Sequence, residues 1–195
     1  MIDLAEVHAT IEAYLDRYGT ERDRLAPLLA GLDARTAILS RSTFTGHLTC
    51  SAVLLNRDWQ ALHIRHNVLG RWLCPGGHLE PDDTSLLGAA LREVEEETGI
   101  GASALVVLER FPVDIGVHRF PANPARGEPE HWHFDLRYAF TVAEPPHLRL
   151  QADEVSGSAW LPIEPGALAE KLQPLRHRVA GTGPVTAPLA APLRQ

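Results

Sequence analysis

Residues 75–100 read PGGHLEPDDTSLLGAALREVEEETGI, and the acidic end of this stretch raises the first question about the chain. The spacing of apolar residues predicts a helix over residues 84–98, which ends at Gly99. Four glutamates occupy positions 93–97. Carboxylates near a helix C-terminus are unfavourable by roughly 0.3–1 kcal/mol each, and like charges at i,i+4 add to this cost. Because local rules are most often broken where function requires it, this stretch is a candidate functional site.

The helix geometry brings three of these carboxylates together. Glu93, Glu96 and Glu97 stand at i, i+3 and i+4 and share one face, whereas Glu95 points elsewhere and is expected to be solvated. A hard divalent cation takes oxygen ligands and would offset the repulsion among them. A solvated acidic face is the alternative, and it is the commoner explanation of an acidic run taken alone. We expect the core-facing stripe about a quarter-turn away, formed by Leu87, Ala90, Leu91 and Val94.

A glycine pair precedes the helix, in the loop of residues 75–83. Glycines at this place let the backbone bend sharply and approach a ligand closely, and the Gly77 carbonyl is a further candidate oxygen ligand. Arg92 lies off the face of the three glutamates and is placed to pair with an acid of this loop. The sequence of strand, glycine pair, polar loop, helix and glutamate face is much more specific than any one of its parts.

The rest of the chain surrounds this helix with strands. Alternation and turn signals predict strands at about residues 48–56, 60–66, 71–74, 103–109, 113–119, 131–142 and 154–160, and a last helix over 164–179. This pattern indicates an α+β chain built as an α/β/α sandwich with a mixed β-sheet. We divide it into an N-terminal helical extension (1–42), a main domain (43–180) and a flexible tail (181–195). The extension packs either on the main domain or on a second subunit, so a homodimer is one option.

Composition and charge indicate a globular protein and argue against a nucleic-acid-binding or membrane protein. The 195 residues are 45% apolar and 22% charged, with a net charge of −7, which is ordinary for a soluble globular protein and unfavourable for general nucleic-acid binding. We therefore expect a small-molecule partner and no nucleic acid. The two cysteines do not form a disulfide framework. There is neither an apolar run of eighteen residues nor a signal peptide, so we expect no membrane association and a cytoplasmic location.

The stretch over residues 77–100 resembles the Nudix box, written G-x5-E-x7-R-E-U-x-E-E-x-G-U with U aliphatic. Its second half matches throughout, at Arg92, Glu93, Val94, Glu96, Glu97, Gly99 and Ile100. Its first half departs from the pattern. Counted from Gly77, the first glutamate of the box falls on Asp83, and eight residues instead of seven separate it from Arg92. In the family this glutamate is mainly a structural partner, so the departure concerns Asp83 more than the metal site.

The resemblance implies a fold, a reaction and a cofactor. It implies the Nudix fold, and hydrolysis of a diphosphate that links a nucleoside to a second group, with Mg²⁺ or Mn²⁺. The expected metal ligands are Glu93, Glu96, Glu97 and the Gly77 carbonyl. The expected catalytic residues are Arg92, Glu93 and Glu96, of which Glu96 is our choice as the base that takes the proton of water.

Substrate choice is expected in the strictly alternating strand EHWHFDLRYAF (130–140). Its aromatic side, with Trp132, Phe134, Leu136 and Tyr138, is predicted to be core. Its polar side carries His131, His133, Asp135 and Arg137. This row either lines the substrate cleft, or forms a separate metal site from His131, His133 and His118, or is an exposed or internally paired sheet face.

Three other features are candidates for the site. The segment 118–130 is predicted to be a long loop that forms a rim over the substrate. Trp72 is placed to stack on a base, although core packing is the more frequent role of such a residue. Asp153 or Glu154 is placed to reach the metal cluster, and a local turn role is the alternative.

Two other functions fit the same fold. A nucleotide-sensing regulator without catalysis usually lacks glutamates of the box, and here all three are present. An isoprenoid diphosphate isomerase would need a catalytic cysteine facing a glutamate, for which Cys74 is the candidate. Both remain less favoured than the hydrolase.

Overall fold

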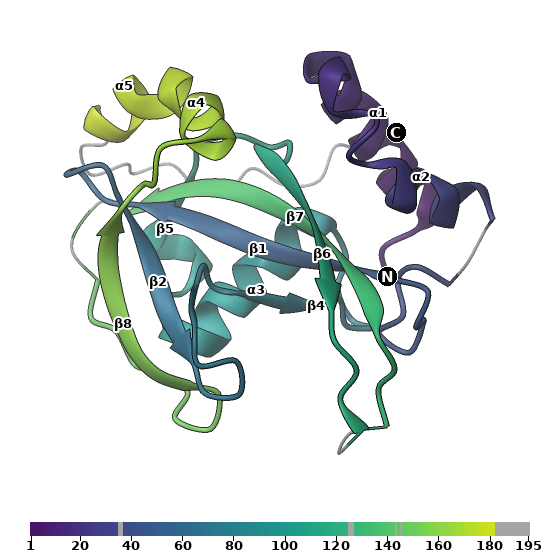
Figure 1. The fold of residues 1–195 in the computed structure, drawn as a ribbon. Helices are drawn as coiled ribbons and strands as arrows, with labels where there is room; N and C mark the ends of the chain where they lie inside the picture. The colour runs from purple at the N-terminus through teal and green to yellow at the C-terminus, as the bar shows by residue number, and fades with distance from the viewer. Residues whose placement is uncertain (35–36, 125–126, 143, 145, 182–195) are drawn as a thin grey trace.

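The computed structural model describes residues 1–34, 37–124, 127–142, 144 and 146–181 (Figure 1). The N-terminal segment forms helices α1 (Leu4–Arg17) and α2 (Ala26–Asp33), separated by a 3₁₀ turn at Gly19–Glu21. Asp3 caps α1 by accepting a hydrogen bond from the Glu6 amide. The predicted flexible tail from residue 182 onward lies outside the described residues, and α5 (Arg176–Ala180) ends just before it.

In the described part of the chain, eight strands form one mixed sheet. They are β1 (His47–Leu55), β2 (Gln60–His66), β3 (Trp72–Leu73), β4 (Gly76–His78), β5 (Leu105–Val107), β6 (Asp114–Phe120), β7 (His131–Val142) and β8 (Val155–Pro162). The central strand β1 runs parallel to β7 and antiparallel to β2 and β4. Every residue of β1 is buried, as expected for a strand covered on both faces.

Helices cover the two faces of the sheet, which gives the predicted sandwich (Figure 1). Even-numbered residues of β1, such as Leu48 and Leu54, pack in one core with α3 (Leu86–Thr98) and the N-terminal helices. Odd-numbered Val53 and Leu55 pack in a second core with α4 (Ala167–Leu172) and α5. The mixed sheet with helical layers confirms the predicted fold class. No helix among the described residues is both long enough and apolar enough to cross a membrane.

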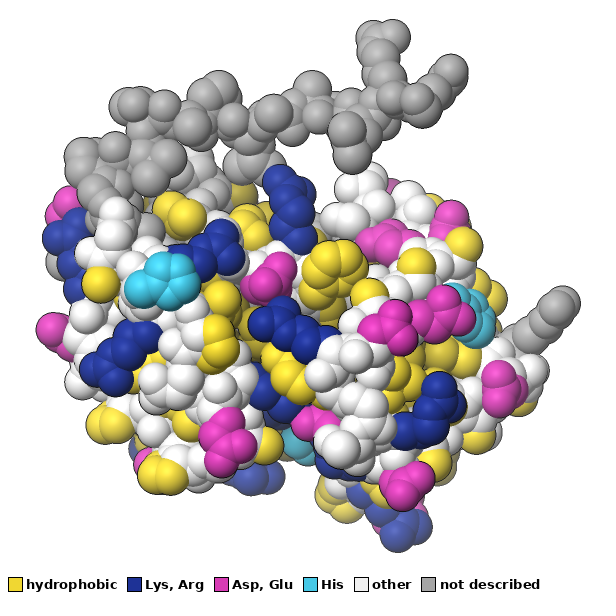
Figure 2. Space-filling model, turned by 90° about the horizontal axis from the view of Figure 1, so that it is seen from above, with side chains coloured by type: hydrophobic (Ala, Val, Ile, Leu, Met, Phe, Trp, Pro, Cys, Tyr) yellow, Lys and Arg dark blue, Asp and Glu magenta, His cyan; other side chains and the backbone are white. Residues whose placement is uncertain are grey.

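The N-terminal extension packs on the main domain. Oε1 of Glu6 in α1 accepts a hydrogen bond from the Leu86 amide at the N-terminus of α3 (2.9 Å). Tyr14 of α1 is buried and bonds to Lys171 of α4 (2.8 Å). Figure 2 views the face formed by α4, α5 and α1, where basic and acidic side chains are interspersed. Association of two copies stays a prediction.

Several local predictions need correction. The glycine pair is not in a loop, because Gly76–His78 forms strand β4 and pairs with β1. Segment 118–130 is mostly a hairpin, since β6 extends to Phe120 and a bridge joins Asn123 to Glu128. The last helix is interrupted by a 3₁₀ turn at Gln173–Leu175, where Pro174 lacks the amide that a continuous helix needs.

Candidate active site

Helix α3 begins and ends at well-defined caps. Ser85 accepts a hydrogen bond from the Gly88 amide (3.0 Å), and Gly99 has the left-handed φ of 74° typical of a C′ glycine. The helix therefore begins two residues later than predicted, and Gly99 ends it as predicted. The buried face also differs, because Leu87 and Leu91 are only partly buried while Glu93 and Glu97 are buried.

Glu93 and Glu97 lie against β4. The Gly76 amide donates to Oε2 of Glu97 (3.0 Å), and a Cβ placed on Gly77 would lie 2.5 Å from Oε1 of Glu93. A side chain at position 77 would therefore displace this carboxylate from its present position. The two glutamates are 8% and 3% exposed. The structure thus brings together Gly77, Glu93 and Glu97, three of the four predicted metal ligands.

Burial makes these two carboxylates unusually basic. Burial is the main cause, and together with the nearby charges of Glu96 and Glu154 it raises the pKa of Glu93 to about 7 and that of Glu97 to about 8. Arg92 opposes the shift at Glu93, and the Gly76 amide opposes it at Glu97. Arg92 compensates the charge of Glu93 in part, but two buried carboxylates that repel each other remain costly, and a divalent cation would offset that cost. The residues present therefore fit a hard metal ion.

Arg92 connects the helix to the preceding loop. Its Nη1 donates to Oε1 of Glu93 and to Oε2 of Glu96, both at 2.9 Å. Its Nη2 donates to the backbone carbonyl of His78 (2.9 Å). Two further bonds go to Asp83, which is buried. These acceptors hold the pKa of Arg92 above its ordinary value despite burial. Glu96, the fourth predicted ligand, is half-exposed and lies at the surface end of this network.

The polar row of β7 separates into two groups. Asp135 accepts hydrogen bonds from Ser51 Oγ (2.8 Å), Thr49 Oγ1 (3.2 Å) and Arg137 Nε (3.0 Å). Arg137 also donates to Oδ2 of Asp114 (3.1 Å). Arg137 Nη2 lies 2.8 Å from Nε2 of His118. Asp135 and Arg137 are therefore internally paired, which was one of the three expectations. On the opposite side Phe134, Leu136 and Tyr138 are buried as predicted, and Trp132 is partly buried.

The histidines of the row belong to a different group. His133 lies with His47 of β1 and His78 of β4, and ligand atoms of the three rings are all within 4.8 Å of one another. His131 is adjacent, with its Nε2 2.9 Å from Nε2 of His133. The alternative trio of His131, His133 and His118 shares only His133 with this group, because His118 lies against Arg137 and His131 lies beside the three rings. Sequence reasoning missed His47 and His78, although His47 continues the polar alternation of Thr49 and Ser51.

The other candidates occupy the edges of the site. Trp72 is 42% exposed, so it is not a core residue, and its ring lies over Gly157. Glu154 precedes β8, and its charge acts on both buried glutamates. Cys74 packs beside the second core, near α4, and burial raises the pKa of its thiol to about 11. It does not face the glutamates, which lie on the other side of the sheet.

Comparison with known proteins identifies the family. The family model described as NUDIX domain matches residues 45–179. An RNA pyrophosphohydrolase of Erythrobacter litoralis is 30% identical over 141 residues, which cover 67% of this chain and 84% of that protein. The bovine m7GpppN-mRNA hydrolase NUDT17 is 31% identical over 147 residues, 70% of this chain, but the match spans only 43% of that longer protein. A solved Caenorhabditis elegans Ap4A hydrolase aligns with 67% of this chain and 93% of its own, at 15% identity and a TM-score of 0.46. The chain belongs to the Nudix family.

Proposed function

We propose that the chain is a divalent-metal-dependent pyrophosphohydrolase that cleaves the diphosphate bond of a nucleoside diphosphate linked to another moiety. The observation that carries this proposal is the pair of buried carboxylates, Glu93 and Glu97, held against the glycine pair of β4. Two relatives named as an RNA pyrophosphohydrolase and an mRNA hydrolase support the reaction class.

The proposed metal site uses Glu93, Glu97, the Gly77 carbonyl and Glu96 as ligands for Mg²⁺ or Mn²⁺. The chemistry that such an ion supplies is neutralisation of the diphosphate charge and a lower pKa of bound water. The protein contributes two carboxylates that are already buried and fixed in place. Glu154 is the best candidate for an additional metal ligand, because its charge acts on both Glu93 and Glu97.

Proton transfer requires an acceptor that can return its proton to solvent. Glu96 is half-exposed and bonded to Arg92, so it meets this requirement better than the two buried glutamates. Arg92 acts as a positioning residue, because its guanidinium holds Glu93, Glu96 and the loop at Asp83 in one arrangement.

We propose that residues around the glutamate site recognise the substrate. The half-exposed ring of Trp72 is available to stack on a base. Arg137 and Asp135 would have to release internal partners to bind phosphate, so we propose that they fix the shape of the polar sheet face. His131 and His133 can contact the substrate, as predicted, only if their side chains rotate out of the imidazole cluster.

A second substrate class deserves the same test. The named substrates of the two relatives are RNAs, whereas the net charge of −7 disfavours general nucleic-acid binding. Recognition limited to a phosphorylated 5′ end would satisfy both observations. The alternative of a nucleotide sensor without catalysis predicts binding and no turnover.

The decisive experiment is a hydrolysis screen with Mg²⁺ or Mn²⁺ and identification of products by mass. The substrates are nucleoside diphosphate sugars, dinucleotides, dinucleoside polyphosphates, nucleoside triphosphates, and triphosphorylated and capped RNA oligonucleotides. Metal-dependent cleavage at a phosphoanhydride supports the proposal and names the substrate class. A folded protein that binds nucleotide and cleaves nothing would favour the sensor.

A further inference from the structure

Four imidazoles gather on the sheet face opposite the glutamates. The ring centroids of His47 and His133 are 4.6 Å apart, those of His47 and His78 5.0 Å, and those of His78 and His133 5.1 Å. His131 stacks on His47 at 5.0 Å. The parallel register of β1 and β7 pairs His47 with His133, and β4 brings His78 beside them. The cluster therefore comes from three strands and is fixed by the central part of the sheet.

One ring nitrogen of this cluster lacks a hydrogen-bond partner among the described residues. His47 is 1% exposed, and its Nε2 has no hydrogen-bond partner among the described residues. Its Nδ1 lies 3.2 Å from the Thr43 carbonyl, which can only accept, so the proton of this ring is on Nδ1. Nε2 therefore carries a buried lone pair without a donor. An unmet polar atom of this kind is costly unless a ligand occupies the site.

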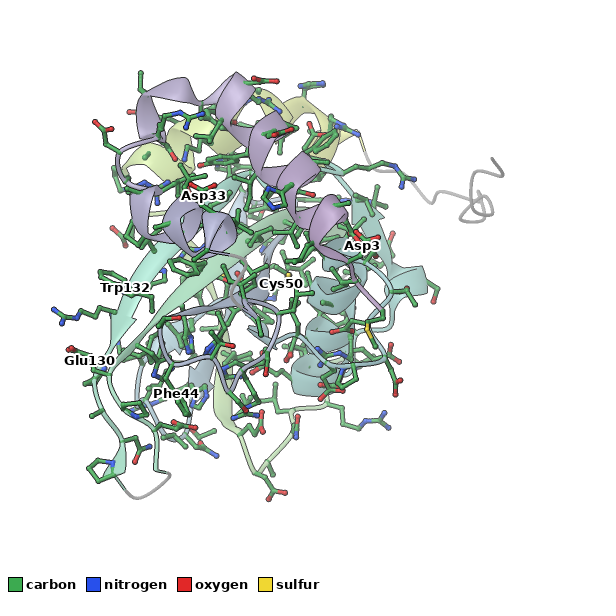
Figure 3. All side chains as sticks on the ribbon, turned by 90° about the vertical axis from the view of Figure 1, so that its right-hand side faces the viewer. Asp3, Asp33, Phe44, Cys50, Glu130 and Trp132 are labelled. Atoms are coloured by element: carbon green, nitrogen blue, oxygen red, sulfur yellow. The ribbon has the colours of Figure 1, made fainter. Side chains whose placement is uncertain are left out.

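His131 is held in the same way. Its Nδ1 lies 2.7 Å from the Pro129 carbonyl, so its Nε2 also presents a lone pair, toward Nε2 of His133. Backbone carbonyls that fix the outer nitrogen of a ring are the usual outer partners of metal-binding histidines. Two aromatic rings pack against the cluster. The ring of Phe120 stacks on His133, with the centroids 4.0 Å apart, and the ring of Phe44, which precedes β1 and is labelled in Figure 3, contacts His131 edge-on.

We propose that His47, His78 and His133 form a second metal site, which binds Zn²⁺ or a cation of similar preference. A group of three imidazoles suits zinc, copper or nickel, and it does not suit Mg²⁺, which takes oxygen ligands. Three protein ligands leave a fourth position for water, or for His131 after a side-chain rotation. Zinc ligands lie about 3.3 Å apart in a tetrahedral site, so small rotations from the present spacing of up to 4.8 Å complete it.

The second site is distinct from the glutamate site but adjacent to it in the chain. Consecutive strand residues point to opposite faces, so Gly77 faces Glu93 while His78 faces the imidazoles. Zinc would tie β1, β4 and β7 together directly beside the glycine pair. The two sites also select different ions, so they can be filled independently.

The test is titration of the chelator-treated full chain with Zn²⁺ and Co²⁺ in the presence of excess Mg²⁺. We expect one equivalent of Co²⁺ to give the visible absorption of a four-coordinate site and Zn²⁺ to displace it. His78→Ala, at a partly buried position, should weaken zinc binding by about 100-fold or more. The matched control is His8→Ala, an exposed histidine of α1, which should bind as the wild type does.

Three results would overturn the proposal: no tight zinc binding, equal affinity in the His78→Ala and His8→Ala variants, or loss of zinc binding in Glu97→Gln. The last would place zinc at the glutamates. Zinc-edge X-ray absorption of the wild-type protein gives an answer that does not depend on folding of a variant. A first shell of imidazole nitrogens supports the site, and a shell of carboxylate oxygens contradicts it.

Discussion

Arg92 and Asp83 form a two-point ion pair, with Nε 3.0 Å from Oδ1 and Nη2 3.1 Å from Oδ2. Asp83 also accepts a hydrogen bond from the Glu80 amide (2.7 Å). The pair closes the loop between β4 and α3 onto the helix that carries the glutamates. The extra residue between Asp83 and Arg92, which breaks the spacing of the box, is accommodated before the Ser85 cap. A shorter acid at the end of a longer loop thus reaches the same guanidinium.

Removal of the Asp83 charge should loosen this loop. Asp83→Asn keeps the size of the side chain but replaces one charged acceptor by an amide group that opposes the guanidinium. We expect the free energy of unfolding to fall by about 1–3 kcal/mol, because the partly buried Arg92 loses half of its two-point partner. Urea unfolding measures the change. Asp82→Asn, at the exposed neighbouring position, is the control and should unfold like the wild type. Equal stability of the two variants would contradict a structural role for Asp83.

Glu97 is expected to be essential for turnover. Glu97→Gln removes the charge but leaves an oxygen for the Gly76 amide, so the fold should persist. We expect kcat on the substrate found in the screen to fall by about 100-fold or more, because a metal ligand contributes several kcal/mol to the barrier reduction. Glu95→Gln on the exposed side of the same helix is the matched control. Near-normal kcat in Glu97→Gln would remove this residue from the proposed metal site.

Local sequence patterns predicted the helix of the box well. Its end at Gly99, the solvated Glu95 and the pairing of Arg92 with a loop acid all depend on residues close together in the chain. The buried position of Glu93 and Glu97 was not predicted, because the helical stripe of Leu87, Ala90, Leu91 and Val94 looked more apolar. Strands β4 and β1 determine which side of α3 packs against the sheet. The sequence of the helix alone does not determine this side.

Contacts between strands that are far apart in the chain were harder to predict from the sequence. Strand β4 is short and rich in glycine, so no strand propensity marks it, and only pairing with β1 creates it. The same pairing brings His78 to the imidazole cluster. The parallel register of β1 and β7 brings His47 there from a segment 86 residues away. Alternation within residues 130–140 placed His131 and His133 on the same face, where their rings meet, but gave no means to find their partners.

The pH dependence of stability follows from the buried acid Glu97. Its pKa in the folded state, about 8, lies above the ordinary value of 4.5, so folding favours the protonated carboxyl. The stabilising contribution is fully present below about pH 4.5 and is lost as the pH rises through about 8. Metal-free wild-type protein should therefore lose stability across this window relative to Glu97→Gln, by on the order of 1–3 kcal/mol.

Urea unfolding of both proteins in chelator, at about pH 5 and about pH 9, measures this difference. Addition of Mg²⁺ at the higher pH should restore the wild type and leave Glu97→Gln unchanged, because the cation stabilises the ionised carboxylate. Parallel pH dependence in the two proteins would mean that Glu97 is not protonated on folding.

Lys171, the only lysine of the chain, joins the N-terminal extension to the main domain. It is 9% exposed, and its Nζ lies 2.5 Å from Oε1 of Glu21, 2.7 Å from Oδ1 of Asp114 and 2.8 Å from the Tyr14 hydroxyl. Desolvation alone would lower the pKa of Lys171, but these partners raise it above its ordinary value. The cation therefore stays charged although it is buried, and it connects α4 to α1, the 3₁₀ turn and β6.

Lys171→Met should destabilise the whole chain, since it leaves the carboxylates of Glu21 and Asp114 short of a buried cation. Arg24 and Arg137 retain part of the compensation, so we expect a loss of about 3 kcal/mol in the free energy of unfolding. The control is Glu170→Gln at the neighbouring exposed position. Limited proteolysis should cleave the Lys171→Met variant first within residues 1–42, because the tie to α1 is lost. A variant with wild-type stability and wild-type cleavage would show that the extension is held by its apolar contacts alone.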